Sequence, residues 1–153
     1  MSIAIVLHAL SAAVWVGGMF FAWLCLRPAL GVVDAAARPQ LWVAVFGRFF
    51  PYVWAALVVL LATGFYLIAG LGGMARVSPW VHVMLGLGIV MMLLFLHVWF
   101  APFRRLKRCV AAGDRAAAGK PLGQIRVLIG INLVLGLVTV ACGALASLYP
   151  VGP

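Results

Sequence analysis

Residues 80–100, WVHVMLGLGIVMMLLFLHVWF, most constrain what this chain can fold into, because these 21 residues carry no formal charge. A helix needs about 20 apolar residues to cross the hydrocarbon core of a bilayer. Three further apolar stretches occupy residues 3–26, 50–69 and 125–149. The sequence therefore predicts an all-α integral membrane protein, a four-helix bundle that forms a single domain over residues 1–153.

The composition also indicates a membrane protein. Of the 153 residues, 67% are hydrophobic and 8% are charged, whereas soluble domains are about 45–50% apolar and about 25% charged. A net charge of +9 would indicate nucleic-acid binding in a soluble protein, but here the basic residues lie between apolar spans. In that position they mark membrane orientation, so we expect the lipid bilayer as a partner and no nucleic acid.

The basic residues are distributed unevenly over the three loops that would connect the spans. The first loop contains Arg27, Arg38 and Arg48, the second contains only Arg76, and the third contains seven Lys and Arg residues. The positive-inside rule places the first and third loops in the cytoplasm. Both termini are then expected on the extracytoplasmic side of a bacterial inner membrane.

Two histidines, His8 and His82, are expected on different spans at a similar depth below the extracytoplasmic surface. A histidine inside a membrane span is costly unless it has a partner, so each is a candidate functional residue. Imidazole is a strong ligand for haem iron and copper, and helical bundles hold such groups between facing helices. Met84 and Cys142 lie at the same level, and their sulfur atoms would favour cuprous copper. The simpler alternative is that both histidines only pack or lie at the membrane interface.

Haem would also need a slot of aromatic and small residues and a cation for its propionates. Trp15 and Gly18 of the first span and Arg76 at the outer surface are the candidates for these roles. A second site in the inner half would pair Met19 with His97, although methionines are more often packing residues than ligands. His97 has an alternative interpretation as an interfacial residue near the basic loop.

The last span carries features suited to packing between helices. Gly136, Thr139 and Gly143 form a narrow stripe of small residues, which lets a neighbouring helix approach closely. Asn132 is the one strongly polar residue of this span, and we expect it to form an interhelical hydrogen bond.

The first and third spans resemble those of a known family. The first span, LHALSAAVWVGGMFFAWLCLRPAL, resembles the opening helix of the CopD-like membrane proteins and of the related HemJ type of protoporphyrinogen oxidase, and the third resembles their W-x-H-x-K segment. The CopD resemblance implies movement of copper across the inner membrane. The HemJ resemblance implies haem b with His8 as ligand and oxidation of a porphyrinogen. However, Met84 stands where the HemJ pattern has lysine, which argues against that oxidation. The shared residues of the first span are His8, Val14, Trp15, Gly17, Gly18, Phe20 and Phe21.

Three functional hypotheses follow. The leading one is haem b held by His8 and His82 near the periplasmic face, for electron transfer or redox chemistry with a redox partner or quinone. The alternative is a copper-handling membrane protein that uses His8, His82, Met84 and Cys142 without haem. The third is a cofactor-free assembly partner. A homo-oligomer is compatible with each hypothesis, and whether the protein is an enzyme stays open.

Overall fold

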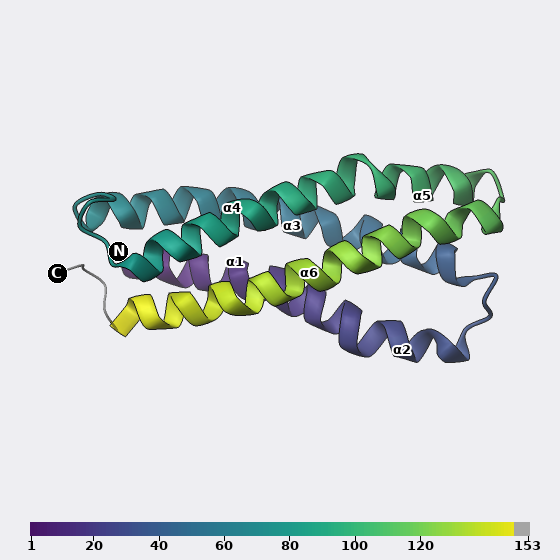
Figure 1. Cartoon of the computed structure of the whole chain (residues 1–153), viewed down its shortest axis with the longest axis horizontal. Coiled ribbons are helices and arrows are strands. Elements are labelled where there is room, and N and C mark those ends of the chain that lie inside the picture. Colours follow the sequence, from purple (N-terminus) through teal and green to yellow (C-terminus); the bar gives the residue numbers. More distant parts are fainter. Residues whose placement is uncertain (149–153) are drawn as a thin grey trace.

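The computed structural model describes residues 1–148, which form four long helical segments lying side by side (Figure 1). The predicted all-α four-helix membrane bundle is confirmed. The expected end of the last span at residue 149 lies outside the described residues. The elements are α1 (Ser2–Phe20), the π-helix η1 (Phe21–Leu26), α2 (Arg27–Ala29), the 3-10 turn η2 (Leu30–Val32), α3 (Arg38–Gly70), α4 (Pro79–Phe100), α5 (Pro102–Ala111) and α6 (Arg115–Leu148).

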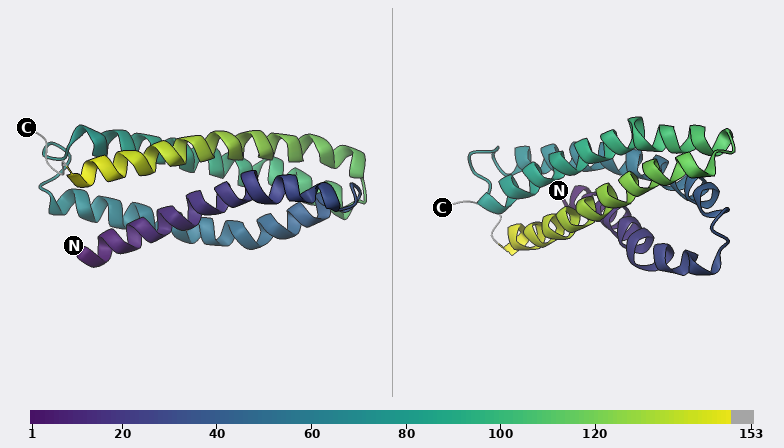
Figure 2. Two further views of the ribbon diagram at one scale, coloured as in Figure 1. Left: turned by 90° about the horizontal axis from the view of Figure 1, so that it is seen from below. Right: turned by 45° about the vertical axis from the view of Figure 1, so that its right-hand side comes forward.

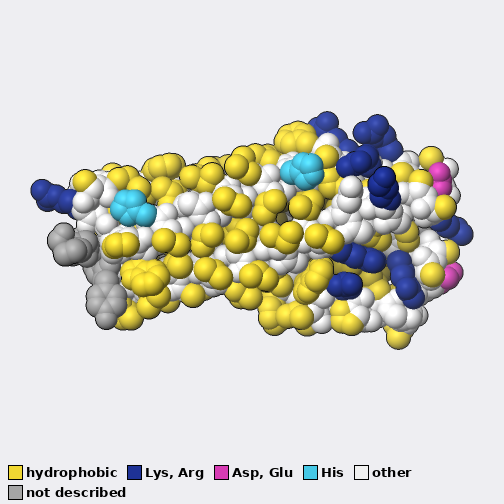
Figure 3. Space-filling view, viewed as in Figure 1, with side chains coloured by type: hydrophobic (Ala, Val, Ile, Leu, Met, Phe, Trp, Pro, Cys, Tyr) yellow, Lys and Arg dark blue, Asp and Glu magenta, His cyan; other side chains and the backbone are white. Residues whose placement is uncertain are grey.

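The bundle has two distinct ends. The start of α1, the end of α3, the start of α4 and the end of α6 lie together at what we call the terminal end (Figure 1). Most of the Lys and Arg side chains visible in Figure 3 gather at the opposite end, which we call the basic end. Hydrophobic side chains cover the surface between them, and each of the four segments is long and apolar enough to cross a membrane. Which side of the membrane each end of the bundle faces stays a prediction from the positive-inside rule.

Two helices begin well before the residues at which the apolar spans were predicted to start. α3 begins at Arg38 and not at residue 50, and α6 begins at Arg115 and not at residue 125. The added turns of α3 bury Trp42 and Phe46 almost completely. A helix of 33 residues is roughly 50 Å long, which exceeds the hydrocarbon thickness of about 30 Å. Tertiary packing therefore continues the helices beyond the apolar windows that hydropathy detects.

A column of aromatic rings joins α3 to α4 and α5. Phe50 lies at its centre, with ring centroids 5.1 Å from Phe46, 5.4 Å from Phe95 and 4.9 Å from Phe103. Such pairs contribute about 0.5–1.5 kcal/mol each beyond the burial of their surface. The members of this aromatic column are Trp42, Phe46, Phe50, Trp54, Phe95, Trp99 and Phe103.

α6 packs closely on α4 along the predicted stripe of small residues. A Cβ placed on Gly136 would lie 2.9 Å from Val16 Cγ2 and 3.1 Å from Met91 Cε, so the absence of a side chain is needed there. The Asn132 amide donates a 3.4 Å hydrogen bond to the Met91 carbonyl, which is the interhelical bond expected of this residue.

We predict that Gly136→Leu destabilises the bundle, because the new side chain must displace Val16 or Met91 from a packed interface. Overpacking of this kind costs about 1–3 kcal/mol. Thermal unfolding of the purified protein in detergent measures the loss. Gly86→Leu is the matched control, since a Cβ at the exposed Gly86 meets nothing within 4 Å. Equal unfolding temperatures for both variants would contradict the packing described above.

Candidate functional site

Each of the four long helices carries one side chain with a hydrogen-bonding or metal-binding atom at a similar depth from the terminal end. We call His8, Thr63, Met84 and Cys142 the terminal-end layer. Each lies five to seven residues from the terminal-end residue of its helix, which is roughly 8–11 Å at 1.5 Å per residue. These residues come from α1, α3, α4 and α6, which lie side by side (Figures 1 and 2).

His8 is half-buried against α3. Its Nδ1 lies 2.8 Å from Thr63 Oγ1. The ring also lies beside Gly64, where a Cβ would be 3.4 Å from His8 Cε1, an ordinary contact distance. The imidazole therefore has the polar partner that a histidine within a membrane span requires.

The surroundings of Thr63 determine which ring nitrogen of His8 carries the proton. Thr63 Oγ1 also lies 2.6 Å from the Val59 carbonyl oxygen, which can only accept a hydrogen bond. The single hydroxyl proton of Thr63 is donated there, so Thr63 accepts from His8 Nδ1–H. His8 Nε2 is then left with a free lone pair, the arrangement by which an outer partner orients a metal-binding histidine.

Met84 packs against α6 at Gly143, the residue next to Cys142. Cys142 is buried, and the neighbouring Gly143 would bring a Cβ to 3.4 Å from Met84 Sδ. The thioether of Met84 therefore reaches α6 one residue from the thiol. Thioether and thiolate sulfur are the soft ligands that select cuprous copper. Within residues 1–148 no three His, Cys, Asp or Glu side chains are grouped to hold a metal.

His82 lies on the outside of α4. It is exposed, and its Nδ1 lies 3.2 Å from the Ser78 carbonyl oxygen of the preceding turn. Its predecessor Val81 is buried in a cluster with Ile68 and Ala146, and a helix rotates by about 100° per residue. Packing of Val81 thus turns His82 outward. His8 takes its partner from α3 instead, so the predicted arrangement with the two imidazoles facing each other is not supported.

Other side chains of the protein occupy the space beside the residues that were predicted to form a haem slot. Trp15 is buried and packs edge-on against Phe95, with ring centroids 6.3 Å apart. The Phe49 ring occupies the space above Gly18, where even a Cβ would overlap it. Arg76 lies over Gly72 in the turn between α3 and α4. The described arrangement therefore does not support the expected slot.

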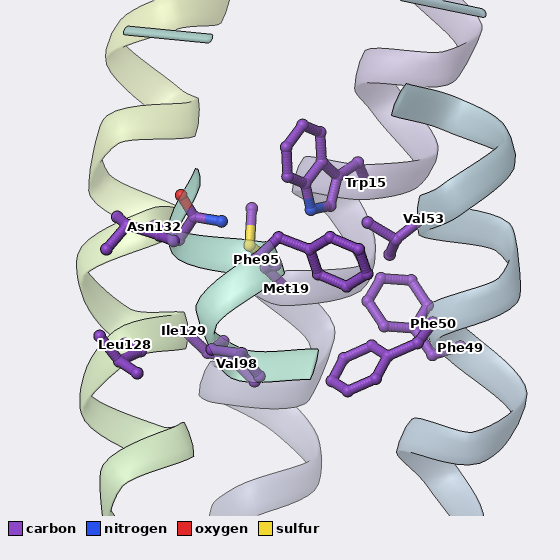
Figure 4. Close-up of a pocket in the computed structure, with 11 residues that line it drawn as sticks. Trp15, Met19, Phe49, Phe50, Val53, Phe95, Val98, Leu128, Ile129 and Asn132 are labelled. Carbon is purple, nitrogen blue, oxygen red and sulfur yellow. The ribbon is translucent and has the colours of Figure 1, made fainter. Parts of the chain in front are cut away.

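Met19 and His97, the predicted second site, differ in burial: the first side chain is inside the bundle and the second is on its surface. Met19 is buried and lines a small pocket in the middle of the bundle with Trp15 and Asn132 (Figure 4). His97 is exposed on α4. The sequence analysis did not identify Thr63 as a partner of His8. The available signal was a hydroxyl residue beside a glycine within an apolar span.

Comparison with known proteins gives one match. A family model described as Copper resistance protein D matches residues 43–146, about two thirds of the 153-residue chain. The matched region includes Thr63, Met84 and Cys142, and His8 precedes it. No curated protein and no solved structure matches the chain. The CopD-like resemblance is confirmed, and the match does not show a relation to the HemJ type.

We predict that Thr63→Val releases His8 from its single tautomer, because valine offers no oxygen to Nδ1–H. Nitrogen-15 NMR of histidine-labelled protein should show a protonated Nδ1 and a bare Nε2 for His8, and a mixture in the variant. The lost hydrogen bond should cost about 1 kcal/mol of stability. Thr139→Val is the control, since the Thr139 hydroxyl contacts Leu135 O and Met91 Sδ but no histidine. An unchanged His8 spectrum in Thr63→Val would refute the assignment.

Proposed function

We propose, from the premise that the chain belongs to the Copper resistance protein D family, that it binds cuprous copper as cargo within the membrane. The ligands would be His8 Nε2 and the sulfur atoms of Met84 and Cys142. The observation that carries the proposal is the 2.8 Å contact of His8 Nδ1 with Thr63 Oγ1, which favours a free lone pair on Nε2, at the depth where Met84 sulfur meets α6.

The chemistry of this donor set fits copper better than harder ions. Oxygen ligands suit magnesium and calcium, but the only acidic side chains of the chain are Asp34 and Asp114. Both accept hydrogen bonds from backbone N–H groups. They lie at the basic end, at the opposite end of the bundle from the terminal-end layer (Figure 3). A site of one imidazole and two sulfur atoms therefore favours a soft monovalent ion.

Two further features would serve entry and passage of the ion. His82 is exposed at the terminal end of α4 with its Nδ1 directed to a carbonyl, so its Nε2 is available as a first contact. Met91 and Met19 are buried deeper in the bundle, and Met91 Sδ lies 3.6 Å from Thr139 Oγ1. These thioethers would offer soft ligands at successive depths below Met84.

Haem b is the second candidate, because a neutral imidazole with a free Nε2 is also suited to haem iron. It would require His8 and His82 to face each other and the rings beside Gly18 to move apart. Absorption spectra of the purified protein, oxidised and reduced, distinguish the two candidates. A haem band that disappears in His8→Gln would replace the copper proposal.

We predict that the purified protein binds cuprous copper in competition with a chromogenic chelator, and that Met84→Leu and Cys142→Ser each weaken binding strongly. Thr63→Val should weaken it by about 10–100-fold, the usual effect of losing the partner of a ligating histidine. Met92→Leu and Cys25→Ser are the matched controls, because neither belongs to the terminal-end layer. Equal copper affinity in the ligand and control variants would exclude this site.

A further inference from the structure

We propose that the basic end contains a second site, independent of copper, which binds the phosphate group of an anionic phospholipid. It lies in a cleft where η1 and α2 face α3 and α6. Trp23, Arg27, Trp42, Phe46 and Arg126 line this cleft.

The backbone opens this cleft. η1 is a six-residue π-helix, a form that is rare and frequently marks functional sites. Beyond it, α2 diverges from α6 toward the basic end (Figures 1 and 2). The resulting cleft is open to the outside and narrow, with a volume of about 10 Å³ that holds roughly one water-sized group. A phosphate oxygen can therefore enter from the side of the bundle while the rest of the headgroup stays outside.

Two arginines from different elements, Arg27 of α2 and Arg126 of α6, line the cleft, and none of the residues that line it is acidic. The Arg27 guanidinium stacks over the Trp23 ring at 4.5 Å, which holds this cation in place. Bringing like charges together is unfavourable unless an anion compensates them.

Two buried donors at the cleft have no hydrogen-bond partner. Trp42 is 2% exposed, and its indole Nε1 is unpaired. Arg126 Nε is likewise buried and unpaired. A buried donor left without an acceptor is unfavourable, and more so when it is charged. An anion in the cleft would offer acceptor oxygens to both residues.

The position of the cleft favours a lipid phosphate. It lies at the end of the apolar zone where headgroups are expected, between membrane-spanning segments. Basic pockets between such helices recognise anionic headgroups. Guanidinium groups match the geometry of phosphate oxygens, and Trp23 and Phe46 offer apolar surface to the adjoining glycerol and acyl chains.

The test measures the thermal unfolding temperature of the full-length, metal-free protein in detergent micelles with added phosphatidylglycerol. We expect a concentration-dependent rise that phosphatidylcholine does not reproduce. Arg126→Gln should need roughly tenfold more phosphatidylglycerol for the same rise, because it loses a charge-assisted hydrogen bond. Trp42→Phe removes only the indole N–H and should weaken the response while keeping the ring.

Arg108→Gln is the control, since this exposed arginine on α5 does not line the cleft, and it should respond like the unmodified protein. A rise with inorganic phosphate alone that Arg126→Gln loses would support the same phosphate chemistry with a soluble source. The proposal is overturned if neither phosphate source raises the unfolding temperature. It is also overturned if phosphatidylcholine acts equally, or if Arg126→Gln and Trp42→Phe respond like Arg108→Gln.

Discussion

The relative heights of the four helices determine which side chains lie at the same level of the bundle. The aromatic column around Phe50 holds α3 against α4 and α5, and the close approach at Gly136 holds α6 against α1 and α4. The His8–Thr63 hydrogen bond ties α1 to α3. Because these contacts set the register, each helix brings one donor to the terminal-end layer. Loss of the register would leave single donors without a site.

The apolar stretches predicted the helices well because a bilayer imposes a simple length requirement. The predicted starts of α3 and α6 were too late in the sequence. Hydropathy measures how well a segment partitions into lipid, and it does not measure how far a helix continues beyond the apolar residues. Residues 38–49 continue α3 because Trp42 and Phe46 find aromatic partners, which only the folded bundle supplies. The basic residues 103–110 belong to α5, which packs on α6 and buries Phe103 and Leu106.

The candidate site shows the same division between what the sequence predicts and what tertiary packing decides. The depth of His8, Met84, Cys142 and His82 follows from counting residues along a helix. The direction of each side chain depends on the rotation of the helix about its axis, which distant contacts set. Burial of Val81 turns His82 outward, so the pairing of the two histidines was not supported. The two ends of the bundle differ in chemistry, with His8, Met84 and Cys142 near one and most of the Lys and Arg side chains at the other.

X-ray absorption at the copper K-edge, on copper-loaded protein in detergent, tests the central claim most directly. The account predicts a cuprous edge with sulfur scatterers and one imidazole in the first shell, and loss of the imidazole contribution in His8→Gln. A first shell of nitrogen and oxygen alone, or a spectrum that His8→Gln leaves unchanged, would contradict it.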